Sequence, residues 1–171
     1  MKGYVQVYTG NGKGKTTAAL GLAIRAAGAG LKVYIAQFVK GTGYSEHNIL
    51  AKLSDSITIK QYGQGFFINR KPLEEDIAAA REGLKKMEKI MCSGKYQLII
   101  LDEADIATYY NLFSVDDLLD FIRKKPKEVE LIITGRMADS RIIDAADLVT
   151  EMKEIKHYFQ KGVKARNGIE K

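Results

Sequence analysis

The sequence predicts an α/β fold: a single P-loop NTPase-like domain in which helices cover both faces of a mostly parallel sheet. Short β-rich runs alternate with helical segments along the chain, which is typical of parallel α/β proteins. The glycine-rich stretch TGNGKGKTT at residues 9–17 lies between the first strand and the first helix, where phosphate-binding loops occur. The apolar run LIIL at residues 98–101 ends in two carboxylates, as expected for a strand buried on both faces.

Six segments are expected as strands because they are rich in β-branched, aromatic and other apolar residues. These strands are expected at residues 4–9, 32–38, 57–62, 98–103, 129–136 and 148–155. Four other segments have helical features, such as alanine and leucine before a glycine stop, or Pro72 followed by three acids. The helices are expected at residues 16–30, 72–91, 115–125 and 139–147, and a loop is expected at residues 39–48.

The chain of 171 residues is expected to form one domain, residues 1–171, and its 46% hydrophobic content allows a real core. We expect neither a membrane span nor a signal peptide, because no apolar run approaches the roughly 20 residues that a bilayer requires. Cys92 is the only cysteine, which excludes an internal disulfide, and we expect it to be packed on an apolar helix. These features predict a cytoplasmic protein with no membrane partner.

The formal net charge of +6 is concentrated at the end of the chain, where residues 153–171 contain six Lys or Arg and two Glu. Such a basic tail could bind nucleic acid, a phosphorylated ligand or only water. It lacks the repeated aromatic residues on which bases stack, so we do not expect nucleic acid as a partner.

The glycine-rich stretch almost matches the phosphate-loop pattern G-x-x-x-x-G-K-[ST], except that Thr9 stands where the first glycine is expected. Free amide hydrogens at the start of the helix would point at an anion, Lys15 would reach the terminal phosphates, and Thr16 would place its hydroxyl on Mg²⁺. The alternative is a flexible glycine turn. The candidate nucleotide-binding residues are Gly10, Asn11, Gly12, Lys13, Gly14, Lys15, Thr16 and Thr17, and the three glycines are expected to adopt torsions that other residues resist.

Two further motifs end buried strands at the same edge of the predicted sheet. Asp102 and Glu103 follow the run LIIL and are the candidate magnesium carboxylates, the alternative being solvated acids at a strand end. The letters DEAD do not indicate a helicase, because a helicase motor requires two such domains. Arg136, in IITGR, would bind phosphate oxygens together with Lys13 and Lys15, the alternative being a solvated loop arginine.

Several segments together resemble the P-loop type of ATP:corrinoid adenosyltransferase. They are YTGNGKGKTTAALGLAIRAAGAGLKVYIAQFVKG, LDE, IITGR, ADLVTEM and KHYFQKGVKARNGIE, and they cover nearly the whole chain. The resemblance implies transfer of the 5′-deoxyadenosyl group of ATP to the reduced cobalt of a corrinoid, with release of triphosphate. It further implies Lys15 and Thr16 at phosphate and metal, Glu103 near Mg²⁺, Arg136 near phosphate, an electron donor for the cobalt, and a cytoplasmic homodimer.

The chain also departs from the family pattern. Many members carry an N-terminal extension that helps to cover the active site, and we expect none here, so that a neighbouring subunit or the basic tail closes the site. The corrinoid loop, usually similar to GTGFTW, reads GQGFFI, with Ile68 in place of the tryptophan, and Lys171 stands in place of the final aromatic residue. Phe66 and Phe67 are the candidate corrinoid contacts, with Phe66 against the lower face of the corrin. The alternative places one of the two rings in the core.

Cobalt(I) is a strong nucleophile, so the chemistry requires no side-chain base, and His47 and His157 are expected at a helix start or on the surface. The protein instead has to align the two reactants and stabilise the triphosphate, for which Lys15 and Arg136 are the candidate catalytic residues. Two other classes stay open. A phosphotransferase or NTPase would cleave at the γ-phosphate, and a basic nucleic-acid-binding module would lose affinity steeply with salt.

Overall fold

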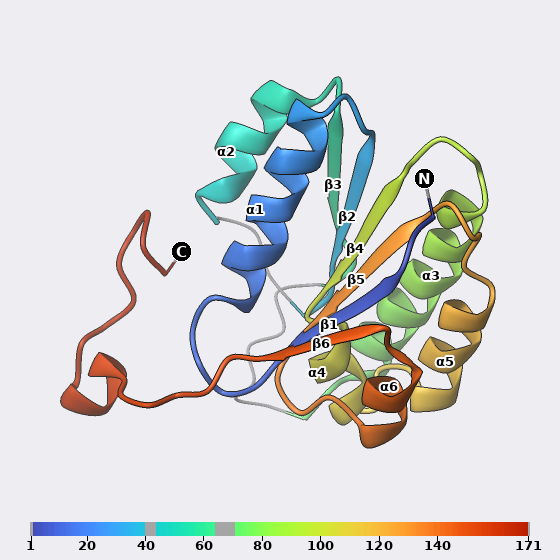
Figure 1. Cartoon of the computed structure of the whole chain (residues 1–171). Helices are drawn as coiled ribbons and strands as arrows, with labels where there is room; N and C mark the ends of the chain where they lie inside the picture. The colour runs from blue at the N-terminus through green and yellow to red at the C-terminus, as the bar shows by residue number, and fades with distance from the viewer. Residues whose placement is uncertain (1, 40–43, 64–70, 171) are drawn as a thin grey trace.

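The computed structural model describes residues 2–39, 44–63 and 71–170, which form one six-stranded sheet with helices on both faces (Figure 1). The strands lie in the order β3-β2-β4-β5-β1-β6, and every neighbouring pair is parallel. They are β1 (Val5–Thr9), β2 (Val33–Gln37), β3 (Ile57–Gln61), β4 (Leu98–Asp102), β5 (Glu130–Thr134) and β6 (Leu148–Glu151). This arrangement confirms the predicted fold class.

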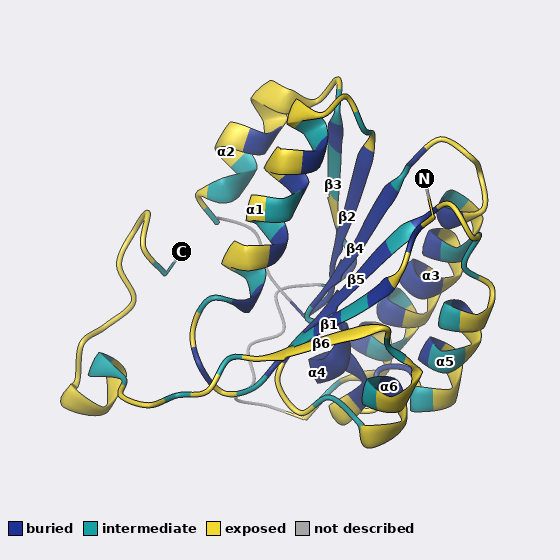
Figure 2. Cartoon of the chain, in the orientation of Figure 1, coloured by how far each residue is buried: buried dark blue, intermediate teal, exposed yellow. Residues whose placement is uncertain are grey.

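The helices divide between the two faces of the sheet. They are α1 (Lys15–Gly28), α2 (Glu46–Leu50), α3 (Glu74–Met91), α4 (Ala104–Tyr109), α5 (Val115–Arg123) and α6 (Ser140–Ala145), with short 3₁₀ helices η1 (Ala51–Leu53) and η2 (Tyr158–Lys161). Helices α1 and α2 pack on one face, and α3 to α6 pack on the other (Figure 1). Strands β2 and β4 are buried along their whole length, whereas β6 at the edge of the sheet is exposed (Figure 2).

Helix α1 lies close to the sheet because its buried stripe is made of small residues. Ala19, Ala23 and Ala26 recur at helical spacing and pack in one cluster with Ile100 and Ile132 of the central strands. A methyl group is the largest side chain that α1 presents at these positions, so the helix backbone approaches the strands closely. This contact places the beginning of α1 at the carboxyl edge of the sheet.

The order of the strands brings residues that are distant in sequence to this same edge. Strand β5 lies between β4 and β1, and all strands run in one direction. The register pairs Gln37 with Asp102 and Tyr8 with Thr134. The last residues of β2, β4, β5 and β1 therefore meet beside the loop that leads into α1, where ligands bind in open α/β sheets.

The predicted strands and helices are confirmed, with observed ends that differ by a few residues. The short helices α2 and α4 were not predicted, because five or six residues carry little helical periodicity. The expected packing of Cys92 was wrong. This residue directly follows α3 and is exposed, because both the helix and its buried stripe end one residue earlier at Met91. Within the described ranges, no helix is long and apolar enough to cross a membrane.

Gly83, in the middle of α3, provides a test of the packing between this helix and the end of β3. A Cβ atom at Gly83 would lie 2.7 Å from Cβ of Tyr62, whereas a Cβ atom at Gly21 in α1 would meet nothing within 4 Å. We therefore expect Gly83→Ala to lower the free energy of unfolding by about 1–3 kcal/mol. Gly21→Ala should raise it by about 0.5–1 kcal/mol, since alanine favours the helix. Urea unfolding of both variants measures these changes, and a stabilised Gly83→Ala variant would contradict the close approach of Tyr62 to α3.

Candidate functional site

The loop between β1 and α1 has the backbone of a phosphate-binding turn. Gly10 and Gly14 have φ values of 95° and 117°, which favour glycine, and Gly14 is the residue that precedes the first turn of α1. Lys15, the first residue of the helix, is buried, and its ammonium donates a hydrogen bond of 2.7 Å to the carbonyl oxygen of Gly12. The side chain of Lys15 thus folds back over the loop, within the site that the sequence predicted.

Gly12 is required for a different reason from the one the sequence suggested. Its φ is not in the left-handed region, but its amide donates to the carbonyl oxygen of Met152 at 2.6 Å. A Cβ atom at Gly12 would lie 2.5 Å from that same oxygen. Thr9, in place of the first glycine of the motif, is a buried strand residue whose carbonyl oxygen accepts from the amide of Met152. The loop is therefore held against the segment that follows β6.

The carboxylate of Asp102 is buried at the end of β4 and accepts hydrogen bonds from one helix, α1, and from two strands, β5 and β2. Its Oδ1 accepts from the hydroxyl of Thr16 at 2.9 Å and from the hydroxyl of Thr134 at 2.7 Å. Its Oδ2 accepts from the amide Nε2 of Gln37 at 3.1 Å. Thr16 and Asp102, both predicted to bind Mg²⁺, are thus hydrogen-bonded to each other, whereas Thr134 and Gln37 were not predicted as site residues.

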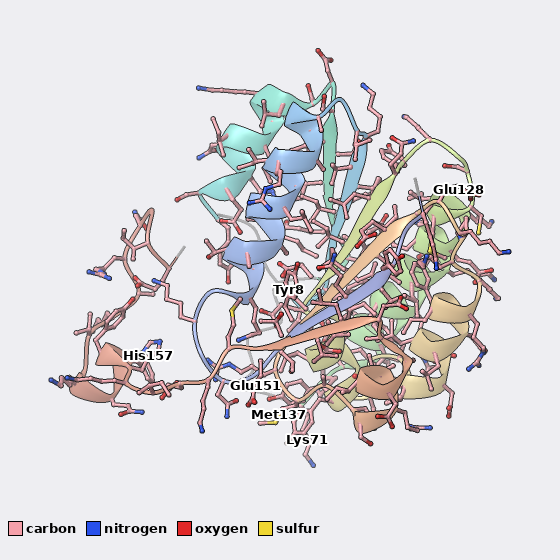
Figure 3. All side chains as sticks on the ribbon, in the orientation of Figure 1. Tyr8, Lys71, Glu128, Met137, Glu151 and His157 are labelled. Carbon is pink, nitrogen blue, oxygen red and sulfur yellow. The ribbon has the colours of Figure 1, made fainter. Side chains whose placement is uncertain are left out.

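The turns that follow three neighbouring strands are locally strained. Val39 after β2, Glu103 after β4 and Met137 after β5 have φ values of 64°, 61° and 58°, which non-glycine residues adopt uncommonly. The backbone amide of Glu103 donates to the hydroxyl of Thr134, which helps to hold this turn. Strained residues of this kind cluster where structures bind ligands, and Figure 3 shows Met137 near the same end of the sheet as Glu151.

A cavity of about 750 Å³ lies over the loop and the first turns of α1. The predicted residues that line it are Gly12, Lys13, Gly14, Lys15, Thr16, Thr17, Glu103 and Arg136. Its walls come from the beginning of α2 on one side and from the end of the chain, at Gly168 to Glu170, on the other. Gly10, Asn11 and Asp102 do not line this cavity. Phe66 and Phe67, predicted to contact the corrinoid, lie outside the described residues, as does Ile68.

The cavity is lined by three cations, Lys13, Lys15 and Arg136, and by three carboxylates, Glu46, Glu103 and Glu170. Burial lowers the pKa of Lys15, an effect to which nearby Arg136 adds and which the carboxylates of Glu103 and Asp102 oppose. A bound polyanion would oppose this shift as well and would favour the ammonium form. Among the residues that the structure describes, no group of three or more His, Cys, Asp or Glu side chains could hold a metal by itself.

The basic tail folds back toward the loop, so that the end of the chain lies near α1 and α2 (Figure 1). The ammonium of Lys13 lies 2.8 Å from Glu170 and 2.9 Å from the hydroxyl of Tyr158. Arg166 also pairs with Glu170, and the hydrogen bonds from Arg166, Lys13 and Tyr158 lower the pKa of the Glu170 carboxyl. Part of the positive charge of the tail and of the loop is thus already paired within the chain.

His47 and His157 differ in position and in hydrogen-bond partners more than the sequence suggested. His47 is in the first turn of α2, as expected for a helix start, but it is half-buried and its Nε2 lies 2.7 Å from Oε1 of Gln37. His157 is on the tail (Figure 3), where its Nδ1 accepts from the amide of Phe159, and it lines the cavity. The sequence did not indicate the contact between His47 and Gln37, because this contact joins α2 and β2 only through side chains.

Asp105 was also missed. It lies in the first turn of α4, is fully buried, and neither carboxyl oxygen has a hydrogen-bond partner among the described residues. Burial, with a smaller contribution from Glu103, raises the pKa of Asp105 to about 8. Its Cβ contacts the turn after β5, since a Cβ atom at Gly135 would lie 2.7 Å from it. The letters AD after LDE gave no indication that this carboxyl is buried.

A parallel sheet with a glycine-rich loop between its first strand and first helix, a buried lysine and a buried carboxylate at the end of β4 defines a P-loop NTPase-like protein. The flagellar accessory protein FlaH from Methanocaldococcus jannaschii has a similar fold, with a TM-score of 0.62, 17% identity, and coverage of 88% of this chain and 71% of FlaH. At this identity the similarity supports the fold alone.

The chain belongs to the ATP:corrinoid adenosyltransferase family BtuR/CobO/CobP, whose sequence profile matches residues 1–170. It is 35% identical over 170 residues to the corrinoid adenosyltransferase of Pseudomonas aeruginosa, covering 99% of this chain and 84% of the relative. It is 36% identical over 170 residues to that of Escherichia coli strain K12, covering 99% and 86%. The resemblance drawn from the sequence motifs is thereby confirmed, and the protein is a transferase.

The buried carboxyl of Asp105 makes the stability of the fold depend on pH. An ordinary Asp in the unfolded chain has a pKa near 3.9. Since the pKa is about 8 in the folded protein, the unfolded state loses its proton first as the pH rises. The free energy of unfolding should therefore fall between about pH 4 and pH 8, with a contribution from this group of at most about 1.4 kcal/mol per pH unit.

Asp105→Asn removes this titration and keeps the size of the side chain. Relative to the unchanged protein, the variant should gain stability steadily from pH 4 to pH 8 and show no further gain above pH 8. Urea unfolding at a series of pH values measures the difference. Asp120→Asn, at an exposed position of α5, serves as the control. A difference that does not change with pH would show that Asp105 is ionised in the folded protein.

Proposed function

We propose that the protein transfers the 5′-deoxyadenosyl group of ATP to the cobalt(I) of a reduced corrinoid and releases triphosphate. The observation that carries the proposal is the buried Lys15 beside a cavity of about 750 Å³, in a chain of this family. The loop amides and the start of α1 provide partial positive charge for the phosphates. Thr17 follows at the first turn of the helix and also lines the cavity.

The reaction demands alignment and charge stabilisation more than proton transfer. Cobalt(I) supplies the electron pair for the new cobalt–carbon bond, and the bond between C5′ and the triphosphate oxygen breaks. Negative charge then grows on the leaving triphosphate. We propose that Lys15 and Arg136, which both line the cavity, stabilise this charge. Each cation at about 4 Å contributes roughly 4 kcal/mol before desolvation costs, at an effective dielectric near 20.

Mg²⁺ is the proposed cofactor, with Thr16, Asp102 and Glu103 as the residues that would hold it. The donor set fits a hard cation: a hydroxyl and two carboxylates, and no imidazole or thiolate among them. Thr16 donates its hydroxyl proton to Asp102, so the hydroxyl oxygen keeps lone pairs for a cation. Magnesium in such sites takes its remaining ligands from water and phosphate, which agrees with the small number of carboxylates. When bound, the ion would offset charge on the triphosphate.

The partners and the assembly of the protein are proposals as well. We propose that the protein is a cytoplasmic homodimer. A separate electron donor would reduce the cobalt of the corrinoid, and Phe66 and Phe67 would contact the corrinoid. The exposed apolar residues Leu148 and Val149 on β6 and Phe159 on the tail support a second copy as a partner. The tail residues at the cavity wall support closure of the site by the tail. Sedimentation velocity tests the dimer, and a fully active monomer at low concentration would exclude it.

One incubation tests the reaction. Protein, Mg-ATP and a chemically reduced corrinoid are mixed, and the optical spectrum and the phosphate products are followed. The proposal predicts the alkylcobalt spectrum together with one triphosphate per turnover. ADP or inorganic phosphate as the product, with no change at cobalt, would favour a phosphotransferase or NTPase.

Lys15→Ala tests the assignment of the loop in the same assay. It removes a cation from the leaving group, and we expect the rate of transfer to fall at least about a hundredfold. Lys86→Ala is the matched control, because Lys86 is exposed on α3 and pairs with Glu82 on the same helix. Circular dichroism should show both variants folded. Near-normal turnover by folded Lys15→Ala would refute the role of the loop.

A further inference from the structure

A chain of hydrogen bonds connects α2 with the carboxylate of Asp102. Nε2 of His47 lies 2.7 Å from Oε1 of Gln37, and Nε2 of Gln37 donates to Oδ2 of Asp102 at 3.1 Å. Gln37 is fully buried at the end of β2, so its side chain depends on protein groups for its hydrogen bonds. The other carboxylate oxygen of Asp102 accepts from Thr16 and Thr134. None of the sequence motifs predicted Gln37 or His47 at the site.

The chemistry of the three groups fixes the direction of each hydrogen bond. The NH₂ group of Gln37 donates to Oδ2 of Asp102, so the carbonyl oxygen Oε1 of Gln37 points the other way. That oxygen only accepts, so Nε2 of His47 carries the proton. Nε2 of Gln61 lies 3.5 Å from the same nitrogen of His47. Because that nitrogen carries a proton, it cannot accept a hydrogen bond from Gln61.

Removal of the imidazole would leave the buried carbonyl of Gln37 without this donor. An unsatisfied buried acceptor is costly, and rotation of the amide to find another donor would withdraw the NH₂ group from Asp102. The carboxylate would then lose the amide donor on Oδ2. A histidine with only a packing role could donate its hydrogen bond to any acceptor on α2 or β3. His47 instead contacts the same amide group that donates to Asp102.

We propose that His47 is a positioning residue for the metal site, acting through Gln37 on Asp102. The proposal rests on the proposed function, because Asp102 and Thr16 are the residues assigned to Mg²⁺. Helix α2 carries His47 and, with the two residues before it, contributes Tyr44, Ser45 and Ile49 to the wall of the cavity. The wall of the nucleotide cavity and the metal-binding carboxylate are thus parts of one hydrogen-bonded unit.

Binding of Mn²⁺ in the presence of ATP, without corrinoid, tests this role directly, because no turnover is involved. Electron paramagnetic resonance measures free Mn²⁺, and calorimetry in excess EDTA measures the affinity for ATP alone. His47→Ala should weaken binding of Mn²⁺ about tenfold. The affinity for ATP in EDTA should stay unchanged. His47→Gln, which places an N–H donor at the position of Nε2, should restore most of the Mn²⁺ affinity.

Two controls separate positioning from packing. Asn48→Ala, at the exposed neighbouring position of α2, should behave as the unchanged protein in both measurements. In a Gln37→Met background, which lacks both hydrogen bonds, His47→Ala should have no further effect on Mn²⁺. If Gln37→Met does not fold, the rescue by His47→Gln decides alone, and a folded His47→Gln variant as weak as His47→Ala overturns the proposal.

Three other results would also overturn it. They are an unchanged affinity of His47→Ala for Mn²⁺, an equal loss of ATP affinity in EDTA, and a full effect of His47→Ala in the Gln37→Met background. If any of these three results is obtained and the unchanged protein still performs adenosyl transfer, the positioning role of His47 fails and the proposed function stands. If the unchanged protein with ATP binds no Mn²⁺, the assignment of the metal residues fails together with this role.

Discussion

The buried carboxylate of Asp102 is the constraint on which the arrangement of the site depends. A carboxylate removed from water is stable only if polar groups replace its hydration. Here the replacements come from α1 through Thr16, from β5 through Thr134 and from β2 through Gln37. The carboxyl ends of the central strands and the first turn of α1 are consequently held in one register around a negative charge. A shift of any of these elements would remove one of the groups that stabilise the charge.

The order of the strands makes this constraint possible. With β5 between β4 and β1, the hydroxyl of Thr134 lies between the carboxylate and the glycine-rich loop, and its oxygen also accepts from the amide of Glu103. The positive φ of Glu103 turns the chain sharply after β4, so that this side chain lines the cavity while Asp102 stays beneath it. Two successive carboxylates thereby occupy different environments, one hydrogen-bonded in the interior and one on the cavity wall.

Most of the fold and the centre of the site could be predicted from the sequence, because both are encoded locally. Strand periodicity, the alanine stripe of α1 and the spacing of Gly14, Lys15 and Thr16 each depend on residues within one element. Contacts between elements could not be predicted in this way. Gln37 and His47 meet only through the register of β2 and the position of α2, and the burial of Asp105 depends on the turn after β5. The proximity of Gly12 to Met152 has the same origin.

The segment after β6 and the glycine-rich loop near the start of the chain are connected by backbone hydrogen bonds and by an ion pair. Gly12 and Thr9 bond to the backbone at Met152, which fixes where the tail leaves β6. From there the tail returns to the loop, and Glu170 pairs with Lys13. A polyphosphate in the cavity would attract Lys13 and repel Glu170, so the pairing would weaken as the anion binds. Glu170 would keep its ion pair with Arg166, and the wall of the cavity would stay in place through the backbone contacts at Met152.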